Sequence, residues 1–194
     1  MTNNGDESAV DLALVRRVQH GDKRAFDLLV SKYQLRLAKL VGRLVSDRSE
    51  AQDVVQEAFI KAYRALPNFR GDSAFYTWLY RIAVNAAKNH LVARSRRPPG
   101  DDVDITDGDV EEAGVVVADL ATPESYAVRD QLQAALTQAL GELPEDLRTA
   151  LTLCEIEGLS YEDIARVLDC PIGTVRSRIF RARRTIDVKL RPYL

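Results

Sequence analysis

The C-terminal part of the chain concentrates arginine in one short segment. Seven basic residues and one acidic residue lie between Gly173 and Arg191. Guanidinium groups bind phosphate and make paired hydrogen bonds to guanine, so this density of arginine indicates contact with DNA. A solvated basic helix face is the ordinary alternative. Phe180 argues against that alternative, because a solvated face gains nothing from an aromatic ring.

The stretch from Gly158 to Arg184 is typical of a helix-turn-helix, whose second helix enters the major groove of DNA. Ser160 is the expected N-cap of the first helix, with Asp163 in the position that completes a capping box. Pro171 is expected to end that helix, because the residue before proline is pushed away from the α region. Thr174 is the expected N-cap of the second helix.

The second helix divides into an apolar stripe and a polar surface. The stripe recurs at i, i+4, i+7 and i+11 and consists of Val175, Ile179, Ala182 and Ile186. The candidate DNA-binding residues on the remaining surface are Thr174, Arg176, Ser177, Arg178, Phe180, Arg181, Arg183 and Arg184. Residues opposite the stripe, Phe180 and Arg181 among them, are expected to meet bases. Those on its flanks, such as Arg176, are expected to meet phosphates.

A second candidate site lies in a helix expected to start after Ser73 and to continue to about residue 94. Beside a core stripe of Phe75, Leu79, Ile82 and Ala86, this helix carries Trp78, Arg81, Asn85 and Lys88 at i, i+3, i+7 and i+10. An aromatic plate, an amide and two cations suit single-stranded nucleic acid, whose bases can be unstacked. A tryptophan half-buried against a neighbouring helix is an equal alternative.

The loop before that helix is expected to form a pocket next to Trp78. Its residues are Phe69, Arg70, Gly71, Asp72 and Ser73, and Ser73 is the expected N-cap of the following helix.

A third surface is predicted on a helix over residues 49–65. One face is apolar, and the other carries Asp53, Gln56 and Glu57 with the apolar Ile60 among them. An apolar residue in a charged surface suits a protein contact, although a lone surface isoleucine is common.

The sequence contains no residue pattern that indicates catalysis or metal binding. The two cysteines, Cys154 and Cys170, form no CxxC pair, and His20 and His90 lie far from both in sequence. No P-loop, GxGxxG, HExxH or GxSxG motif occurs, so we expect neither catalysis nor a metal, a cofactor or a small-molecule substrate. The N-terminus is polar and no apolar run approaches eighteen residues, so a cytoplasmic protein without signal peptide or membrane span is expected.

Helical periodicity and breaker residues predict an all-α protein of two small helical domains. In the first domain, helices are expected over residues 11–20, 23–46, 49–65 and about 74–94. The 194 residues carry a net charge of −2, but residues 98–128 hold nine acidic residues and no lysine or arginine. We therefore predict domains at 1–97 and 124–194, joined by a flexible acidic linker over 98–123.

Three motifs in this order resemble those of the extracytoplasmic-function sigma factors of Gram-negative bacteria, especially the sigma-E / AlgU type. They are the run Asp53–Arg64, the run Phe69–Asn85 and the C-terminal helix-turn-helix. The resemblance covers nearly the whole chain outside the linker. It implies a transcription initiation factor that binds the RNA polymerase core and directs it to a subset of promoters, with envelope stress as the expected trigger.

The resemblance also assigns partners to the candidate surfaces. The helix with Asp53 and Ile60 is similar to the one that docks on the β′ clamp of the polymerase, and β is a further expected contact. The loop from Phe69 to Ser73, with Asn85, resembles the element that captures a flipped base of the promoter −10 element. The second helix of the helix-turn-helix resembles the −35 reader. A membrane-anchored anti-sigma factor that holds the protein at the inner membrane is the regulation that the family implies.

One residue departs from the family pattern. Relatives often carry arginine within a Thr-Leu-Arg-Glu run, where this chain has Cys154 after Thr152 and Leu153. A −35 DNA contact is therefore missing, or Cys154 simply packs in the core beside Leu147 and Leu151. A stand-alone helix-turn-helix regulator and an adaptor that binds only proteins are the rival functions. The stripe beside Trp78 argues against the first, and the arginine surface against the second.

Overall fold

The structure, a computed structural model, describes residues 4–96 and 123–193, with side chains described from residues 7 to 96 and 131 to 193. Within these ranges the chain forms eight α-helices, two short 3-10 helices and no strand, which confirms the all-α class. The α-helices are α1 (Asn4–Gln19), α2 (Lys23–Gly42), α3 (Arg48–Ala65), α4 (Phe75–Ser95), α5 (Pro123–Gly141), α6 (Glu145–Glu155), α7 (Tyr161–Leu168) and α8 (Ile172–Leu190). The predicted linker falls outside the described residues except for Pro123, where α5 begins.

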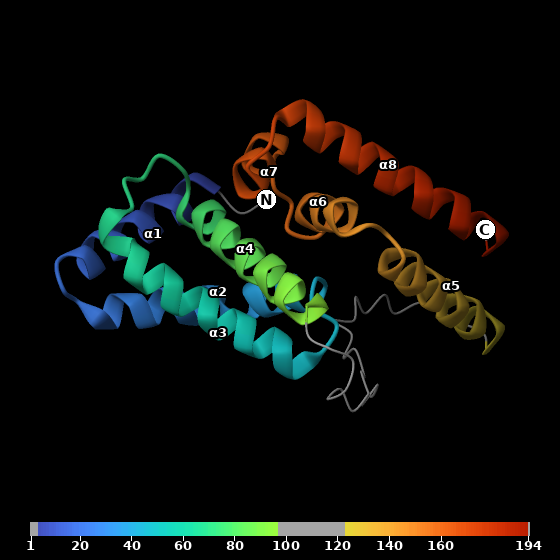
Figure 1. Cartoon of the computed structure of the whole chain (residues 1–194), viewed down its shortest axis with the longest axis horizontal. Coiled ribbons are helices and arrows are strands. Elements are labelled where there is room, and N and C mark those ends of the chain that lie inside the picture. The colour runs from blue at the N-terminus through green and yellow to red at the C-terminus, as the bar shows by residue number, and fades with distance from the viewer. Residues whose placement is uncertain (1–3, 97–122, 194) are drawn as a thin grey trace.

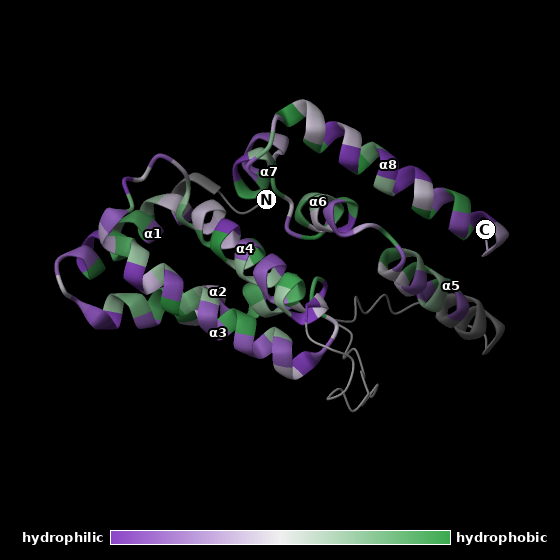
Figure 2. Cartoon of the chain, viewed as in Figure 1, coloured by the Kyte–Doolittle hydropathy of each residue, from purple (hydrophilic) through white to green (hydrophobic). Residues whose placement is uncertain are grey.

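The helices form two bundles, α1–α4 and α5–α8 (Figure 1). In the first bundle α2, α3 and α4 surround fully buried residues such as Leu29, Tyr33 and Leu79. In the second, α6 and α7 pack against the long α8 around Leu153, Ile164 and Ile179. The apolar stripe predicted for α8 is buried from Val175 to Ala182, and polar and apolar residues alternate along its ribbon as an amphipathic helix requires (Figure 2).

Aspartate caps fix the start of two helices in the first bundle. The Asp22 carboxylate accepts hydrogen bonds from the backbone N–H groups of Arg24 and Ala25 at the start of α2. Arg17 lies 2.7 Å from the same carboxylate and lowers its pKa from the ordinary value. Asp47 accepts in the same way from the N–H of Glu50 in α3. Both caps satisfy donors that have no partner within the helix.

Two predicted caps are wrong. Helix α4 begins at Phe75, after Ala74, and the Ser73 hydroxyl donates to the Ala74 carbonyl instead of accepting from the helix. Helix α8 begins at Ile172, so Thr174 lies inside its first turn and its N–H donates to the Pro171 carbonyl. Pro171 occupies the N-cap position with an extended backbone, and the start of α8 has no side-chain cap hydrogen bond.

The predicted bounds of the first two helices are also corrected. Helix α1 begins at Asn4 and not at residue 11, because nothing breaks the helix in the polar segment, which simply lacks an apolar period. Helix α2 ends at Gly42 and not at residue 46. Leu44 and Val45 are buried beyond its end, so their apolar character extended the predicted helix too far.

A buried carboxylate holds α1 against α2. Asp11 is only 1% exposed, yet it accepts hydrogen bonds from the Tyr33 hydroxyl at 2.5 Å and from Lys32 at 2.6 Å. Burial and the nearby carboxylate raise the pKa of Tyr33 well above its ordinary value. The tyrosine therefore stays neutral and remains a hydrogen-bond donor. None of the described helices is long and apolar enough to cross a membrane.

The two bundles meet where α7 packs on α4. Helix α4 has a second buried stripe besides the predicted one: Thr77, Tyr80, Val84 and Ala87. The Thr77 hydroxyl donates to Asp163 at 3.2 Å, and the Tyr80 hydroxyl donates to Glu157 at 2.7 Å. Burial, Asp163 and a hydrogen bond to it raise the pKa of Tyr76, whose hydroxyl lies 3.5 Å from the same carboxylate. The sequence analysis did not identify this second stripe.

Candidate nucleic-acid interface

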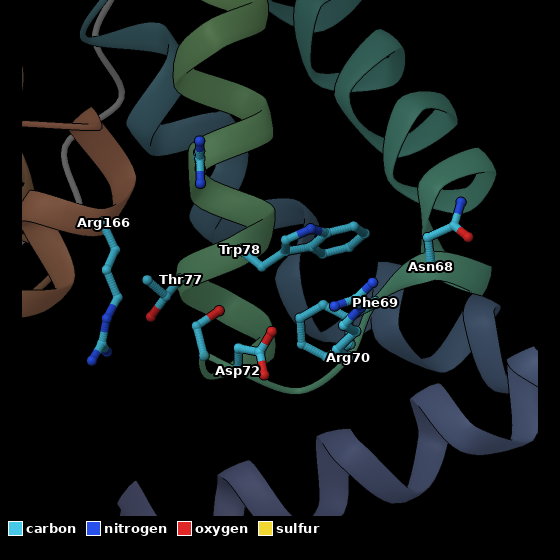
Figure 3. Close-up of a pocket in the computed structure, with 9 residues that line it drawn as sticks. Asn68, Phe69, Arg70, Asp72, Thr77, Trp78 and Arg166 are labelled. Carbon is cyan, nitrogen blue, oxygen red and sulfur yellow. The ribbon is translucent and has the colours of Figure 1, made fainter.

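The loop between the first 3-10 helix (Leu66–Asn68) and α4 opens into a pocket of about 510 Å³. The lining residues are Asn68, Phe69, Arg70, Asp72, Ser73, Thr77, Trp78, Arg81 and Arg166. Figure 3 shows Phe69 in the loop near Trp78 of α4, and Arg166 extending from α7 on the side of Thr77. The structure thus brings together most of the loop residues and two of the stripe residues that the sequence predicted.

Trp78 combines the two alternatives that its sequence position left open. It is half-buried, and its ring lies 5.0 Å from the Phe69 ring and 5.7 Å from the Phe75 ring. Those aromatic contacts fix the indole against the bundle. The remaining surface of the indole lines the pocket. A base that entered the pocket would therefore meet a rigid aromatic wall.

Support for the loop comes from α1, which the sequence analysis did not anticipate. The Gln19 side chain donates hydrogen bonds to the backbone carbonyls of Leu66 and Phe69 at 3.0 and 2.9 Å. Gly71 adopts φ +81°, and a Cβ at this position would lie 3.7 Å from the Leu12 side chain. A side chain at Gly71 would thus be strained by its backbone, although the space around it is adequate. No local sequence pattern links Gln19 to a loop about fifty residues away.

Three predicted residues are not among those that line the pocket: Gly71 in the loop, and Asn85 and Lys88 on α4. Asn85 is exposed and Lys88 is half-buried, and both follow Arg81 along α4 toward its C-terminal end. They extend a polar track from the pocket along the helix surface. Its cations suit a phosphate backbone leaving the pocket, and Asn85 offers an amide to a base edge.

Helix α8 presents the second candidate interface. Phe180 is 66% exposed, which confirms that it faces solvent. Ser177, Arg181, Arg176 and Arg184 are exposed as well, and the Ser177 hydroxyl donates to the Thr174 carbonyl. In the described part of the chain, none of these three arginines is paired with a carboxylate. Their charge is available to an anionic partner.

The other two candidate arginines of α8 are engaged within the domain. Arg178 is only 19% exposed and pairs with Asp146 at 2.8 Å, and Arg183 makes two hydrogen bonds to Glu155. Both carboxylates belong to α6, so these pairs hold α8 on α6. A phosphate contact from either arginine would have to break or share an existing ion pair.

Cys154 packs within the domain. It is half-buried against the core cluster, and burial together with Glu155 raises the pKa of its thiol. The neighbouring Leu147 and Leu151 are buried as the packing interpretation expected. Among the described residues, no group of three histidine, cysteine or carboxylate side chains is placed to hold a metal.

The predicted protein-binding face lies on the solvent side of α3. Asp53, Gln56 and Glu57 are exposed, and Ile60 is 44% exposed. Tyr63, which the sequence analysis did not single out, continues this face one turn later at 40% exposure. Its ring packs on Phe26 at 4.9 Å and is thereby fixed in place. The surface is a small apolar strip rimmed by carboxylates.

These features define a class: a two-domain helical protein with an aromatic pocket on one domain and a basic helix-turn-helix on the other. Comparison with known sequences gives the family. Residues 29–97 match Sigma-70 region 2, and residues 133–186 match Sigma-70 region 4. A "RNA polymerase sigma-H factor" of Pseudomonas aeruginosa is 65% identical over 184 residues, which cover 95% of each chain. The "ECF RNA polymerase sigma-E factor" of Escherichia coli K12 is 56% identical over 97% of this chain and 98% of its own. The chain belongs to the extracytoplasmic-function sigma factors.

Solved structures agree with this assignment. CnrH, in complex with the cytosolic domain of CnrY, is 27% identical with a TM-score of 0.68 and covers 94% of this chain and 98% of its own. The sigma factor RpoE of Bartonella quintana, in complex with the anti-sigma factor NepR, is 28% identical with a TM-score of 0.62; the match covers 86% of this chain and 96% of that one. Sigma factors direct promoter-specific transcription initiation, so the rival interpretation as a stand-alone regulator is no longer needed to explain the helix-turn-helix.

Proposed function

We propose that this chain binds the RNA polymerase core and directs it to promoters by contacting two DNA elements. The observation that carries the proposal is the presence on one chain of two different nucleic-acid surfaces. The aromatic pocket beside Trp78 suits an unstacked base, and the exposed face of α8 suits the major groove of a duplex. A protein that melts one element while holding another needs both.

Each surface has its own role in this proposal. The pocket and the track through Arg81, Asn85 and Lys88 hold the melted strand of the −10 element. On α8, Ser177, Phe180 and Arg181 contact bases of the −35 element, while Arg176 on the flank contacts a phosphate. The α3 strip with Asp53 and Ile60 docks on the β′ clamp. The chain itself catalyses no step, because the polymerase performs the chemistry.

An anti-sigma factor is the proposed regulator. The structurally similar RpoE is in complex with the anti-sigma factor NepR, and CnrH is in complex with the cytosolic domain of CnrY. We further propose that the chain acts in the cytoplasm, where the polymerase and the chromosome are, and that a membrane-anchored partner holds it inactive there.

Reconstitution with purified core polymerase tests the proposed function. The chain should co-elute with core on gel filtration and should support run-off transcription from a subset of promoters selected from genomic DNA. Core alone is the control. Absence of both co-elution and promoter-dependent transcripts would contradict the proposal.

A further inference from the structure

The loop that opens the pocket is held from behind by α1. Gln19, the last residue of α1, donates two hydrogen bonds from its side-chain amide, to the Leu66 carbonyl at 3.0 Å and to the Phe69 carbonyl at 2.9 Å. Both partners are acceptors, so only the NH2 end of the amide fits between them. Gln19 is not one of the residues that line the pocket. Any effect of Gln19 on a bound base therefore passes through the loop.

The two carbonyls belong to residues between which the chain changes direction. Leu66 begins the short 3-10 helix, and its carbonyl also accepts a hydrogen bond from the N–H of Phe69 at 3.0 Å. Phe69 has an extended backbone, with φ −71° and ψ 118°, so the pocket loop starts at this residue. The single amide of Gln19 thus joins the 3-10 turn to the first residue of the loop and fixes the direction in which the loop leaves.

Phe69 transmits this constraint to the wall of the pocket. Its ring lies 5.0 Å from the Trp78 ring and meets the Phe75 ring edge-on at 6.2 Å. Phe69 and Trp78 both line the cavity. A shift of the Phe69 backbone would therefore move the ring on which Trp78 packs. A pocket that selects one base by shape needs these aromatic surfaces at a fixed separation.

Helix α1 supports the loop at a second point and is itself anchored. Leu12 lies two turns before Gln19, at i and i+7 on one helix face, and its side chain is 3.7 Å from the position of a Cβ at Gly71. The same face of α1 thus backs the loop at both ends. The end of α1 is fixed in turn by Arg17, which makes two hydrogen bonds, at 3.0 and 2.7 Å, to the Asp22 cap of α2.

We infer that Gln19 is a positioning residue for base selection, which holds the Phe69 end of the loop so that the pocket prefers one shape of unstacked base. This inference deepens the proposed function and rests on it. Gln19 is exposed, so its amide can be removed without leaving a cavity in the core. One net hydrogen bond shifts an equilibrium by about two- to twelve-fold, which sets the size of the expected effect.

The test compares two variants of the full chain that lose the donor in different ways. Gln19→Glu keeps the shape of the side chain but places an oxygen opposite both carbonyls, and Gln19→Met keeps the length of the side chain without any donor. Gln34→Glu is the matched control, because it makes the same chemical change at an exposed position on α2. Fluorescence anisotropy measures affinity for the single strand of a −10 element that the reconstituted polymerase transcribes, and for the same strand with single-base substitutions.

Trp78 offers a second readout that needs no DNA, because it is the only tryptophan of the chain. Acrylamide quenching of its fluorescence reports how well Phe69 and the loop cover the indole. We expect both Gln19 variants to raise the quenching constant above that of the wild type, because the loop is then free to move away from Trp78. Gln34→Glu should leave the constant unchanged.

In the strand titrations, both Gln19 variants should lower the ratio of affinities between the preferred and the substituted strands by about two- to twelve-fold. Affinity for a −35 duplex should stay at the wild-type value, because the surface of α8 lies in the other bundle. Gln34→Glu should match the wild type in every titration.

Equal discrimination among strands by the wild type and both Gln19 variants would overturn the inference. A loss of affinity that is the same for every strand would overturn it as well, since Gln19 would then serve the fold and not base selection. So would unchanged quenching in both variants, because Phe69 would then not depend on Gln19. Failure of the proposed function has a different signature: the wild type itself would give no promoter-dependent transcripts and no strand preference, while the Gln19 variants would still raise the quenching constant.

Discussion

One residue of the pocket both packs in the bundle and lines the cavity, so its residue type alone did not decide between these two roles. Trp78 is both a packing residue against Phe69 and Phe75 and a wall of the cavity.

The arginines of α8 fall into two groups. Arg178 and Arg183 are bound to carboxylates of α6, whereas Arg176, Arg181 and Arg184 are exposed. Their spacing on a helical wheel did not distinguish the two groups.

Asn85→Ala should weaken discrimination at one position of the −10 strand without affecting the fold. Asn85 is exposed, so the free energy of unfolding should change by no more than about 0.5 kcal/mol. Loss of a base contact should cost about 1–3 kcal/mol at that position. Asn89→Ala, four residues along on the same helix, is the control. Anisotropy with a set of single-base variants of the strand makes the measurement, and equal discrimination by both variants would exclude Asn85 from the site.

Arg181→Ala and Arg176→Ala should differ in kind. Arg181 faces away from the buried stripe, so its loss should cost about 1–3 kcal/mol and relax preference at one base pair of the −35 duplex. Arg176 lies on a flank, so its loss should weaken binding to all sequences alike and reduce the salt slope by about one. Titrations of a duplex panel at several salt concentrations make the comparison. A uniform loss with Arg181→Ala would mean that another face of α8 reads the bases.

At the scale of the helices, the sequence predicted which segments are helical better than it predicted the residues at which each helix begins and ends. Six of the described α-helices correspond to expected segments or motifs in order, and the apolar stripe of α8 is buried from Val175 to Ala182 as the periodicity required. The residue at which a helix begins depends on local backbone and capping contacts, which residue type alone does not reveal. Ser73 and Thr174 are good capping types, but a proline or an extended residue starts each helix instead.

The caps of the helix-turn-helix give a direct test of this point. Ser160 accepts a hydrogen bond from the Asp163 N–H at 3.1 Å, so Ser160→Ala should lower the free energy of unfolding by about 1 kcal/mol. Thr174→Ala removes no cap and should cost less. Denaturant titration of the two variants makes the comparison. A larger loss of unfolding free energy in Thr174→Ala than in Ser160→Ala would show that Thr174 does cap α8.

Helix α3 is the element expected to contact the polymerase. Asp53→Ala combined with Gln56→Ala should weaken core association while leaving stability within about 0.5 kcal/mol, because both side chains are exposed. Glu162→Ala with Gln133→Ala removes the same kinds of side chain from exposed positions of the C-terminal domain. Competition binding to core polymerase distinguishes the pairs. Equal affinity of both double variants would remove this face of α3 from the interface.

At the scale of the whole molecule, the contact between the two bundles should be visible in the titration of Tyr80. Burial and Glu157 raise the pKa of Tyr80 well above its ordinary value of 10.0. The contact between the bundles thus favours the neutral phenol, and its stabilisation is present below about pH 10 and is lost as the pH rises further. In Glu157→Ala, Tyr80 should ionise closer to pH 10. Absorbance at alkaline pH follows this ionisation, and coincident titration curves for wild type and variant would show that Glu157 does not hold Tyr80.

The sequence by itself determined the local features of this protein. Periodicity set the helices, the acidic stretch separated two groups of them, and the arginine-rich helix and the Phe69–Asn85 run marked the surfaces that we propose to face nucleic acid. Helix periodicity depends on neighbours within a few turns, and charge and residue type are read from the sequence directly.

Only the tertiary structure decided which distant groups meet. It supported the pocket loop with Gln19, paired Arg183 with Glu155, and used the stripe from Thr77 to Ala87 to join the two domains. Each of these contacts joins residues from different elements, between 28 and 86 positions apart. A helix pattern shows that a face will be covered, but the side chain that covers it is chosen by how complete helices pack.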